Sequence, residues 1–293
     1  MIRGAAAIVS VVAFVSPIQQ TFRAGVDAVR VDVQVTRKGQ PVANLTSEDF
    51  ELKDSGVVQR IEAVSLEQQP VDVLFVLDTS QSMEGERLAR LKEAAHAAVG
   101  VLDAQDRVAV LTFSERLSRP LDWTPDRAAA GAAIDALAAS GNTSLEDAAL
   151  AALTLRQSAR GRMLALIFSD GLDTASWLDP LRVIDQARQS DLVIDAVMLG
   201  LAPDDARRRW FQSAPVPFRD QFLPALAAET GGDVLTASGA DLTDAFVRIV
   251  RLFKTRYVLS YVPEGVAPDG WHPIAVRLTH GKADIHARRG YQR

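Results

Sequence analysis

The 293-residue sequence contains no cysteine. Disulfides, thiolate catalysis, cysteine-based zinc sites and lipid-modified cysteines are therefore excluded. The absence does not fix the compartment, because exported bacterial proteins often lack disulfides. Histidine is also scarce, and its few positions do not have the spacing of a metal-binding cluster. The histidines are His96, His272, His280 and His286.

The sequence also lacks an excess of basic residues. It has 32 Lys and Arg against 37 Asp and Glu, which gives a formal net charge of −5. A nucleic-acid surface needs a stripe of basic side chains, and the short arginine run at 207–209 does not supply one. We therefore expect no nucleic-acid partner. The 48% hydrophobic and 24% charged content is that of an ordinary globular protein.

The apolar run at the N-terminus is too short for a spanning helix, which needs about 20 apolar residues. Residues 4–18 read GAAAIVSVVAFVSPI after Arg3, as in the basic and apolar regions of a secretory signal. We predict that residues 1–20 are a signal peptide or an N-terminal membrane anchor. The chain is then exported to the periplasm, the cell surface or the medium. Because Pro17 follows Ser16 and no A-x-A site is clear, an uncleaved anchor and a cytosolic apolar arm stay open.

Two flanking segments have the period-2 alternation of antiparallel strands. Every second residue from Val29 to Val35 is a valine, with polar residues between, and residues 274–278 alternate in the same way. Neither flank has enough strands to be stable alone. We predict that the N-terminal β segment, 21–69, pairs with the C-terminal β segment, 256–293, in a small antiparallel region.

The central residues, 70–255, alternate between apolar strands and amphipathic helices. The run at 73–77 is apolar on both faces, as in a sheet that helices cover on both sides. Further strands are expected at 107–113, 163–168, 192–199 and 233–236. Helices are expected at 88–102, 126–138, 145–157, 178–189, 222–230 and 242–253. The repeated β-α units predict an α/β domain with a doubly wound, mostly parallel sheet.

Oxygen-bearing side chains occupy three loops at the ends of these elements. In an open α/β sheet, ligands bind at the carboxyl ends of the strands, so the three loops should meet at one edge. Two carboxylates and three hydroxyls are ligands for a hard divalent cation. Mg²⁺ or Mn²⁺ suits so few carboxylates, whereas Ca²⁺ usually takes more carboxylate or carbonyl oxygens. The candidate metal ligands are Asp78, Ser80, Ser82, Thr143 and Asp170.

Each loop taken alone also has a purely structural explanation. Thr143 and Glu146 form the T-x-x-E pattern of a helix capping box. The two serines could simply open a helix, and the third loop contains an Asp-Gly turn. Glu146 and Asp173 are close to the candidate ligands in sequence, and we expect them to be solvated surface residues. The order of the three loops on one sheet edge favours a metal site.

The three loops resemble the motif of a von Willebrand factor A domain with a metal-ion-dependent adhesion site. Asp78, Ser80 and Ser82 match its Asp-x-Ser-x-Ser element, Thr143 in GNTSL matches its threonine, and Asp170 in FSDG matches its last aspartate. The resemblance covers about residues 70–255 and implies a Rossmann-like fold with these residues as metal ligands.

The flanks extend this resemblance to nearly the whole chain. The sequences FRAGVDAVRVDVQV, NLTSEDFEL, YVLSYVP and ARRGY are similar to those of exported bacterial proteins with a von Willebrand factor A-related domain. The resemblance implies export but does not identify a ligand.

The motif favours binding over catalysis. A phosphoryl-transfer enzyme of the haloacid dehalogenase type needs a second carboxylate two residues after the first, and Ser80 occupies that position. We therefore expect no enzyme, and a metal-dependent hydrolase is the weaker alternative. A bound cation with an open coordination position would accept an Asp or Glu side chain from a protein partner. An assembly factor that works with a separate ATPase is another alternative, although the export signal argues against it. Residues 203–220 are interpreted as an irregular surface excursion that contributes to partner choice.

Overall fold

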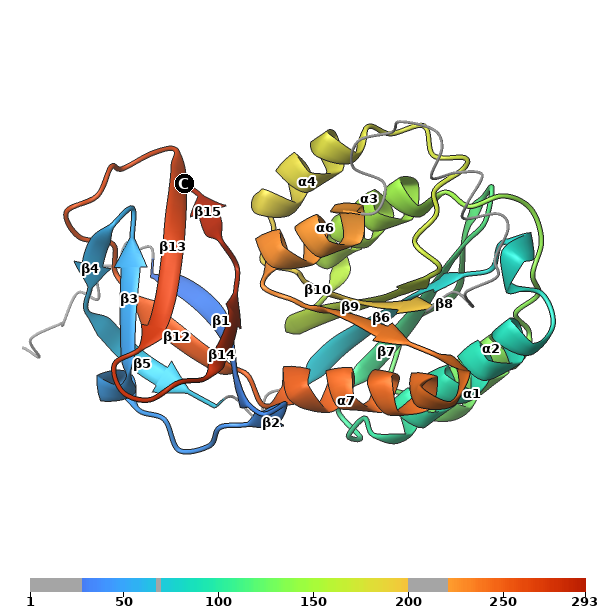
Figure 1. Cartoon of the computed structure of the whole chain (residues 1–293), viewed down its shortest axis with the longest axis horizontal. Coiled ribbons are helices and arrows are strands. Elements are labelled where there is room, and N and C mark those ends of the chain that lie inside the picture. Colours follow the sequence, from blue (N-terminus) through green and yellow to red (C-terminus); the bar gives the residue numbers. More distant parts are fainter. Residues whose placement is uncertain (1–27, 67–69, 200–220) are drawn as a thin grey trace, which may run out of the picture.

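The computed structural model describes residues 28–66, 70–199 and 221–293. An α/β domain lies beside a smaller domain built from strands of both flanking segments (Figure 1). The predicted signal or anchor at 1–20 and the predicted excursion at 203–220 lie outside the described residues.

The α/β domain has a six-stranded sheet in the order β11-β10-β9-β6-β7-β8. Its strands are β6 (Val71–Asp78), β7 (Arg107–Phe113), β8 (Leu117–Thr124), β9 (Arg162–Ser169), β10 (Val193–Leu199) and β11 (Val234–Ala237). Neighbouring strands are parallel except β8, which pairs antiparallel with β7. The prediction of a doubly wound, mostly parallel sheet is confirmed, but β8 was not predicted.

Helices cover both faces of this sheet, and the alternation along β6 shows why. Val73, Phe75 and Leu77 pack in one core with α1, α2 and α7. Leu74 and Val76 pack in the opposite core with α3, α4 and α6. Both faces are apolar because both are covered (Figure 1). The helices are α1 (Glu86–Gly100), α2 (Arg127–Asp135), α3 (Leu145–Leu155), α4 (Pro180–Arg188), α6 (Phe222–Thr230) and α7 (Leu242–Lys254).

The smaller domain contains two antiparallel sheets. One has the order β14-β1-β12-β5 with β2 beside β1, and the other has the order β15-β13-β3-β4. Strand β1 from the N-terminal flank pairs with β12 and β14 from the C-terminal flank, and β13 pairs with β3. The alternating valines of β1 are buried in the core between them. The strands are β1 (Val29–Arg37), β2 (Gln40–Pro41), β3 (Phe50–Asp54), β4 (Val57–Gln59), β5 (Ile61–Ser65), β12 (Tyr257–Tyr261), β13 (Trp271–Leu278), β14 (Asp284–Ala287) and β15 (Gly290–Gln292).

A buried carboxylate joins the two sheets of this domain. Asp54 on β3 accepts hydrogen bonds from the hydroxyls of Tyr261 at 2.9 Å and Tyr291 at 2.8 Å, and it lies 2.9 Å from Nδ1 of His272. Burial alone would raise the pKa of Asp54, but these hydrogen bonds hold it below its ordinary value. Strands β3, β13 and β15 of one sheet are thereby linked to β12 of the other.

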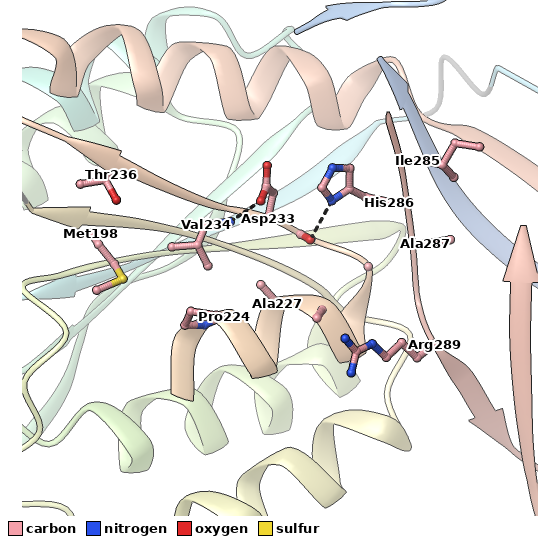
Figure 2. A pocket seen from close by; sticks show the side chains of 13 residues that line it. Met198, Pro224, Ala227, Asp233, Val234, Thr236, Ile285, His286, Ala287 and Arg289 are labelled. Carbon is pink, nitrogen blue, oxygen red and sulfur yellow. Dashed lines mark hydrogen bonds between the residues drawn. The ribbon is translucent and has the colours of Figure 1, made fainter. Parts of the chain in front are cut away.

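The two domains meet closely at the C-terminal end of α6. Gly231 has a φ of +78°, and a Cβ there would lie 2.4 Å from the backbone nitrogen of Arg288. A Cβ on Gly232 would lie 2.0 Å from the carbonyl oxygen of Ile194. Both glycines are therefore required by close backbone approach. Beside them is a pocket of about 550 Å³. Figure 2 shows His286 of β14 and Asp233, next to β11, on its walls.

Candidate functional site

Strand β6 ends in Asp78, whose side chain is completely buried. Its carboxylate accepts hydrogen bonds from the backbone nitrogen of Ser80 at 2.9 Å and from the hydroxyl of Ser169 at 2.8 Å. The pKa of Asp78 is raised to about 6, mainly by burial and also by the nearby charge of Asp170, while hydrogen bonds from Ser80 and Ser169 oppose the shift. The hydrogen bonds to Asp78 therefore do not fully offset the cost of burying its negative charge.

The two serines of the first loop lie in a short 3-10 turn, Gln81–Met83, and the residue before it. The hydroxyls of Ser80 and Ser82 are 3.0 Å apart, and Ser82 donates a hydrogen bond of 3.1 Å to Oδ2 of Asp170. The helix expected at 88–102 is α1, which begins two residues earlier, at Glu86, after Gly85 takes a φ of +80° and ends the turn.

The second loop is bound to the other two by backbone hydrogen bonds. The backbone nitrogen of Gln81 donates to the carbonyl of Gly141 at 2.9 Å. Thr143 donates from its backbone nitrogen to the hydroxyl of Thr174 at 3.0 Å, and its carbonyl accepts from Thr174 and Ala175 at 2.9 Å each. Thr143 is buried at this junction, so its position depends on the third loop.

The third loop begins with Asp170, directly after β9. One oxygen of this carboxylate accepts from the backbone nitrogen of Leu172 at 3.2 Å, and the other accepts from Ser82. In the described part of the chain, no salt bridge joins Asp78 or Asp170 to a basic side chain. The described basic side chains therefore do not neutralise the charges of the two carboxylates.

Asp173 and Glu146 are buried, so the expectation that they are solvated surface residues is wrong. Asp173 accepts hydrogen bonds from the backbone nitrogens of Leu145 at 2.6 Å and Glu146 at 3.3 Å. Its carboxylate therefore caps the first turn of α3. The capping box expected from Thr143 and Glu146 is not used, because a carboxylate from another loop takes this role. Burial and the neighbouring Asp173 raise the pKa of Glu146 to about 8.

The three loops enclose a pocket of about 220 Å³ at the carboxyl end of the sheet. Four predicted ligands line it. Asp78 does not line the pocket, but it accepts a hydrogen bond from the backbone nitrogen of Ser80, which does. The described residues contain no metal-binding group of three or more His, Cys, Asp or Glu, so a cation here would depend on the hydroxyls. An all-oxygen set of hydroxyls with two carboxylates fits a hard cation such as Mg²⁺. The lining ligands are Ser80, Ser82, Thr143 and Asp170.

Sequence reasoning assigned no role to Ser169 or Thr174 and the wrong role to Asp173, although all three make hydrogen bonds within the site. Ser169 lies in the third loop, at the end of an apolar strand beside Asp170, so its hydroxyl was a visible candidate. The roles of Asp173 and Thr174 depend on contacts across about 30 residues, and no local pattern indicates them.

Among the described residues, no helix is long and apolar enough to cross a membrane.

Comparisons with known proteins find a similarity over part of the α/β domain. Residues 73–172 match the family model of the von Willebrand factor type A domain. No curated protein sequence matches the chain.

Solved structures share the fold. A von Willebrand factor type A protein from Catenulispora acidiphila matches with a TM-score of 0.54 and 16% identity, over 86% of this chain and 75% of that one. The vWF domain of the type V pili tip protein Mfa5 from Porphyromonas gingivalis matches with a TM-score of 0.50 and 16% identity, over 62% and 94%.

Proximal thread matrix protein 1 from the mussel byssus, with a zinc-occupied MIDAS motif, matches with a TM-score of 0.51 and 17% identity. The match covers 68% of this chain and 49% of that chain. At these identities the similarity concerns the fold. The family match over residues 73–172 and these structures together show that the α/β domain resembles von Willebrand factor type A domains in sequence and in fold.

Proposed function

We propose that this chain is a divalent-metal-dependent protein-binding module of the cell envelope or exterior. Asp78, Ser80, Ser82, Thr143 and Asp170 would hold Mg²⁺ or Mn²⁺, with Ca²⁺ less suited. The metal supplies a positive centre with a free coordination position, and an Asp or Glu side chain of a partner protein binds there.

The convergence of the three loops carries this proposal. Ser82 contacts both Ser80 and Asp170, which are 90 positions apart in the sequence, and Thr143 joins them on one pocket wall. Asp78, which is hydrogen-bonded to Ser80, adds a second carboxylate to this set of oxygen ligands. Two carboxylates balance the charge of one divalent cation, so an incoming carboxylate meets no excess negative charge from the ligands.

The structural relatives support an adhesive role and an exported location. One is a pilus tip protein and another is a byssus matrix protein, both parts of structures outside the cell. The byssus protein carries zinc in its MIDAS motif, so a test of the metal has to include more than Mg²⁺. The predicted signal or anchor at 1–20 fits the same location.

Calorimetric titration with Mg²⁺, Mn²⁺, Ca²⁺ and Zn²⁺ tests the metal. We expect one equivalent of Mg²⁺ or Mn²⁺ to bind wild type and Asp269→Asn, whose carboxylate is on an exposed turn. Asp170→Asn should remove most of the affinity because it removes one of two charged ligands. A saturating metal at 100 times Kd should stabilise the fold by about 2.7 kcal/mol. Equal binding by Asp170→Asn and wild type would contradict the assignment.

Selection from a random 12-residue peptide library displayed on phage tests the ligand. Phage are bound to the immobilised protein in Mg²⁺ and eluted with EDTA. The proposal expects an Asp or Glu in the enriched peptides and no such enrichment on Asp170→Asn. EDTA-eluted peptides without a common acidic residue would refute the proposed ligand.

A further inference from the structure

The most exposed large apolar side chain among the described residues is Trp177, at 95%. The next is Val58, at 60%. Tryptophan usually buries most of its large surface, and it is enriched among the residues that dominate binding at protein interfaces. A side chain of this size in full contact with water is therefore a candidate contact for a partner.

The backbone around Trp177 is held in place although its side chain is free. The backbone nitrogen of Trp177 donates to the carboxylate of Asp147 at 3.2 Å, and Leu178 donates to the same carboxylate at 3.2 Å. Ser176 donates from its backbone to Asp173 at 3.1 Å and accepts from the backbone nitrogen of Asp147 at 3.2 Å. The ring is presented by an ordered loop, which reduces the entropy that binding has to remove.

The same loop forms the metal pocket. It starts at Asp170 and supplies Leu172 and Thr174 to the pocket wall before it reaches Trp177. It ends at α4, where Leu181 in the first turn is 54% exposed. Two exposed apolar side chains, Trp177 and Leu181, thus follow the pocket residues along the same loop and at the start of the next helix.

We propose that Trp177 is the apolar anchor of the protein partner, an inference that rests on the proposed metal-dependent function. The partner segment carries a large apolar side chain close in sequence to the Asp or Glu that reaches the metal. The acidic residue makes binding depend on the metal, but any accessible Asp or Glu could bind the metal in this way. The contact with Trp177 then decides which acidic segments bind.

The phage selection described above tests this inference when it is repeated on Trp177→Ser. Val58→Ser is the matched control, because it removes another exposed apolar side chain from the distant β domain. Both variants should fold with wild-type stability, since neither side chain is buried. Peptides enriched on wild type are then synthesised, and their affinities are measured with calorimetry in Mg²⁺.

The expected wild-type peptides combine an acidic residue with a large apolar residue at a fixed spacing. Trp177→Ser should bind them about 30-fold more weakly, the loss typical of a truncated interface anchor, with unchanged affinity for Mg²⁺. Val58→Ser should bind them as wild type does.

The possible failures are distinguishable. Acidic peptides without a common apolar residue, or equal binding by Trp177→Ser, would overturn the role of Trp177 and leave the proposed function standing. A lack of EDTA-dependent acidic peptides would overturn both. Binding of wild type but not Trp177→Ser to phosphatidylcholine vesicles, with no effect on the peptides, would make this residue a membrane contact instead.

Discussion

Replacement of Arg256 by methionine should weaken the contact between the two domains and lower the stability of the protein. Arg256 lies between α7 and β12 and is completely buried. Its Nη2 donates to the carbonyl of Gly231 at 2.6 Å and to the carbonyl of His286 at 3.1 Å. These two acceptors belong to different domains, so a single guanidinium joins the end of α6 to β14. Methionine keeps much of the volume but donates no hydrogen bond.

The magnitude follows from the bonds that are lost. Hydrogen bonds from a charged group contribute about 1.5–3 kcal/mol each, and two have good geometry here. The contacts with Gln34 at 3.3 Å and the carbonyl of Asp32 at 3.4 Å are longer and add less. The variant recovers part of this loss because it no longer buries a cation. We expect a net loss of about 3–5 kcal/mol, as when one partner of a buried charged pair is removed.

The loss should depend on pH through Asp195. Burial raises the pKa of this carboxyl to about 6, and the charge of Arg256 holds it from rising further. Without Arg256 the ionised carboxylate is less favourable, so the variant should lose more stability at pH 8 than at pH 5. At pH 5 Asp195 is mostly protonated in both proteins, and only the hydrogen-bond loss is measured.

Urea unfolding followed by circular dichroism and tryptophan fluorescence would measure the loss for wild type, Arg256→Met, Asp195→Asn and the double variant. The two signals are compared because two domains can unfold in separate steps. At pH 8 the double variant should lose less than the sum of the single variants, since each single change leaves its partner without a charge. A loss below about 1 kcal/mol at both pH values, or strict additivity, would refute this account of the junction.

Two further changes test the buried groups. The folded pKa of Asp195 lies above its unfolded value, so this group's contribution to stability is lost as pH rises from about 4 to about 6. Over this range wild type should lose about 3 kcal/mol of stability relative to Asp195→Asn, which keeps the other titrating groups. Urea midpoints across this pH range would measure it, and an identical pH dependence in both proteins would contradict the shift. Gly232→Ala should cost more than about 3 kcal/mol, because the new Cβ would lie 2.0 Å from the carbonyl of Ile194, whereas Gly239→Ala has open space and should be near neutral. Similar melting temperatures for the two alanine variants would contradict the close approach.

The sheet could be predicted from the sequence because the residues of β6 indicate that the strand is buried on both faces. Its residues are apolar at every position from Val73 to Leu77, and a strand buried on both faces requires helices on both sides. Strand β8 could not be predicted in the same way. It reads LSRPLDWT and is mostly exposed, so it has neither an apolar run nor a clear alternation. It forms because β7 offers a free edge immediately before it in the chain.

The metal loops were predictable as a set but not in their detailed packing. The residues that bear oxygen atoms could be chosen because strand ends of a parallel sheet share one edge. The residue that caps α3 could not be predicted, because the sequence offers a local T-x-x-E pattern and the structure uses a tertiary contact in its place. Asp173 reaches the nitrogen of Leu145 from 28 residues away. A sequence pattern cannot decide between a local and a distant acceptor for the same backbone group.

The two carboxylates of the third loop show what separates a possible ligand from a structural residue. Asp173 accepts four hydrogen bonds, from the nitrogens of Leu145, Glu146 and Ser176 and from the hydroxyl of Ser176. Its oxygens are used by the protein, and it does not line the pocket. Among the described residues, Asp170 accepts only from the nitrogen of Leu172 and the hydroxyl of Ser82, and it lines the pocket. In sequence both are acidic residues beside a glycine-containing turn. The donors that the folded chain aims at each carboxylate determine which one keeps an oxygen for a cation.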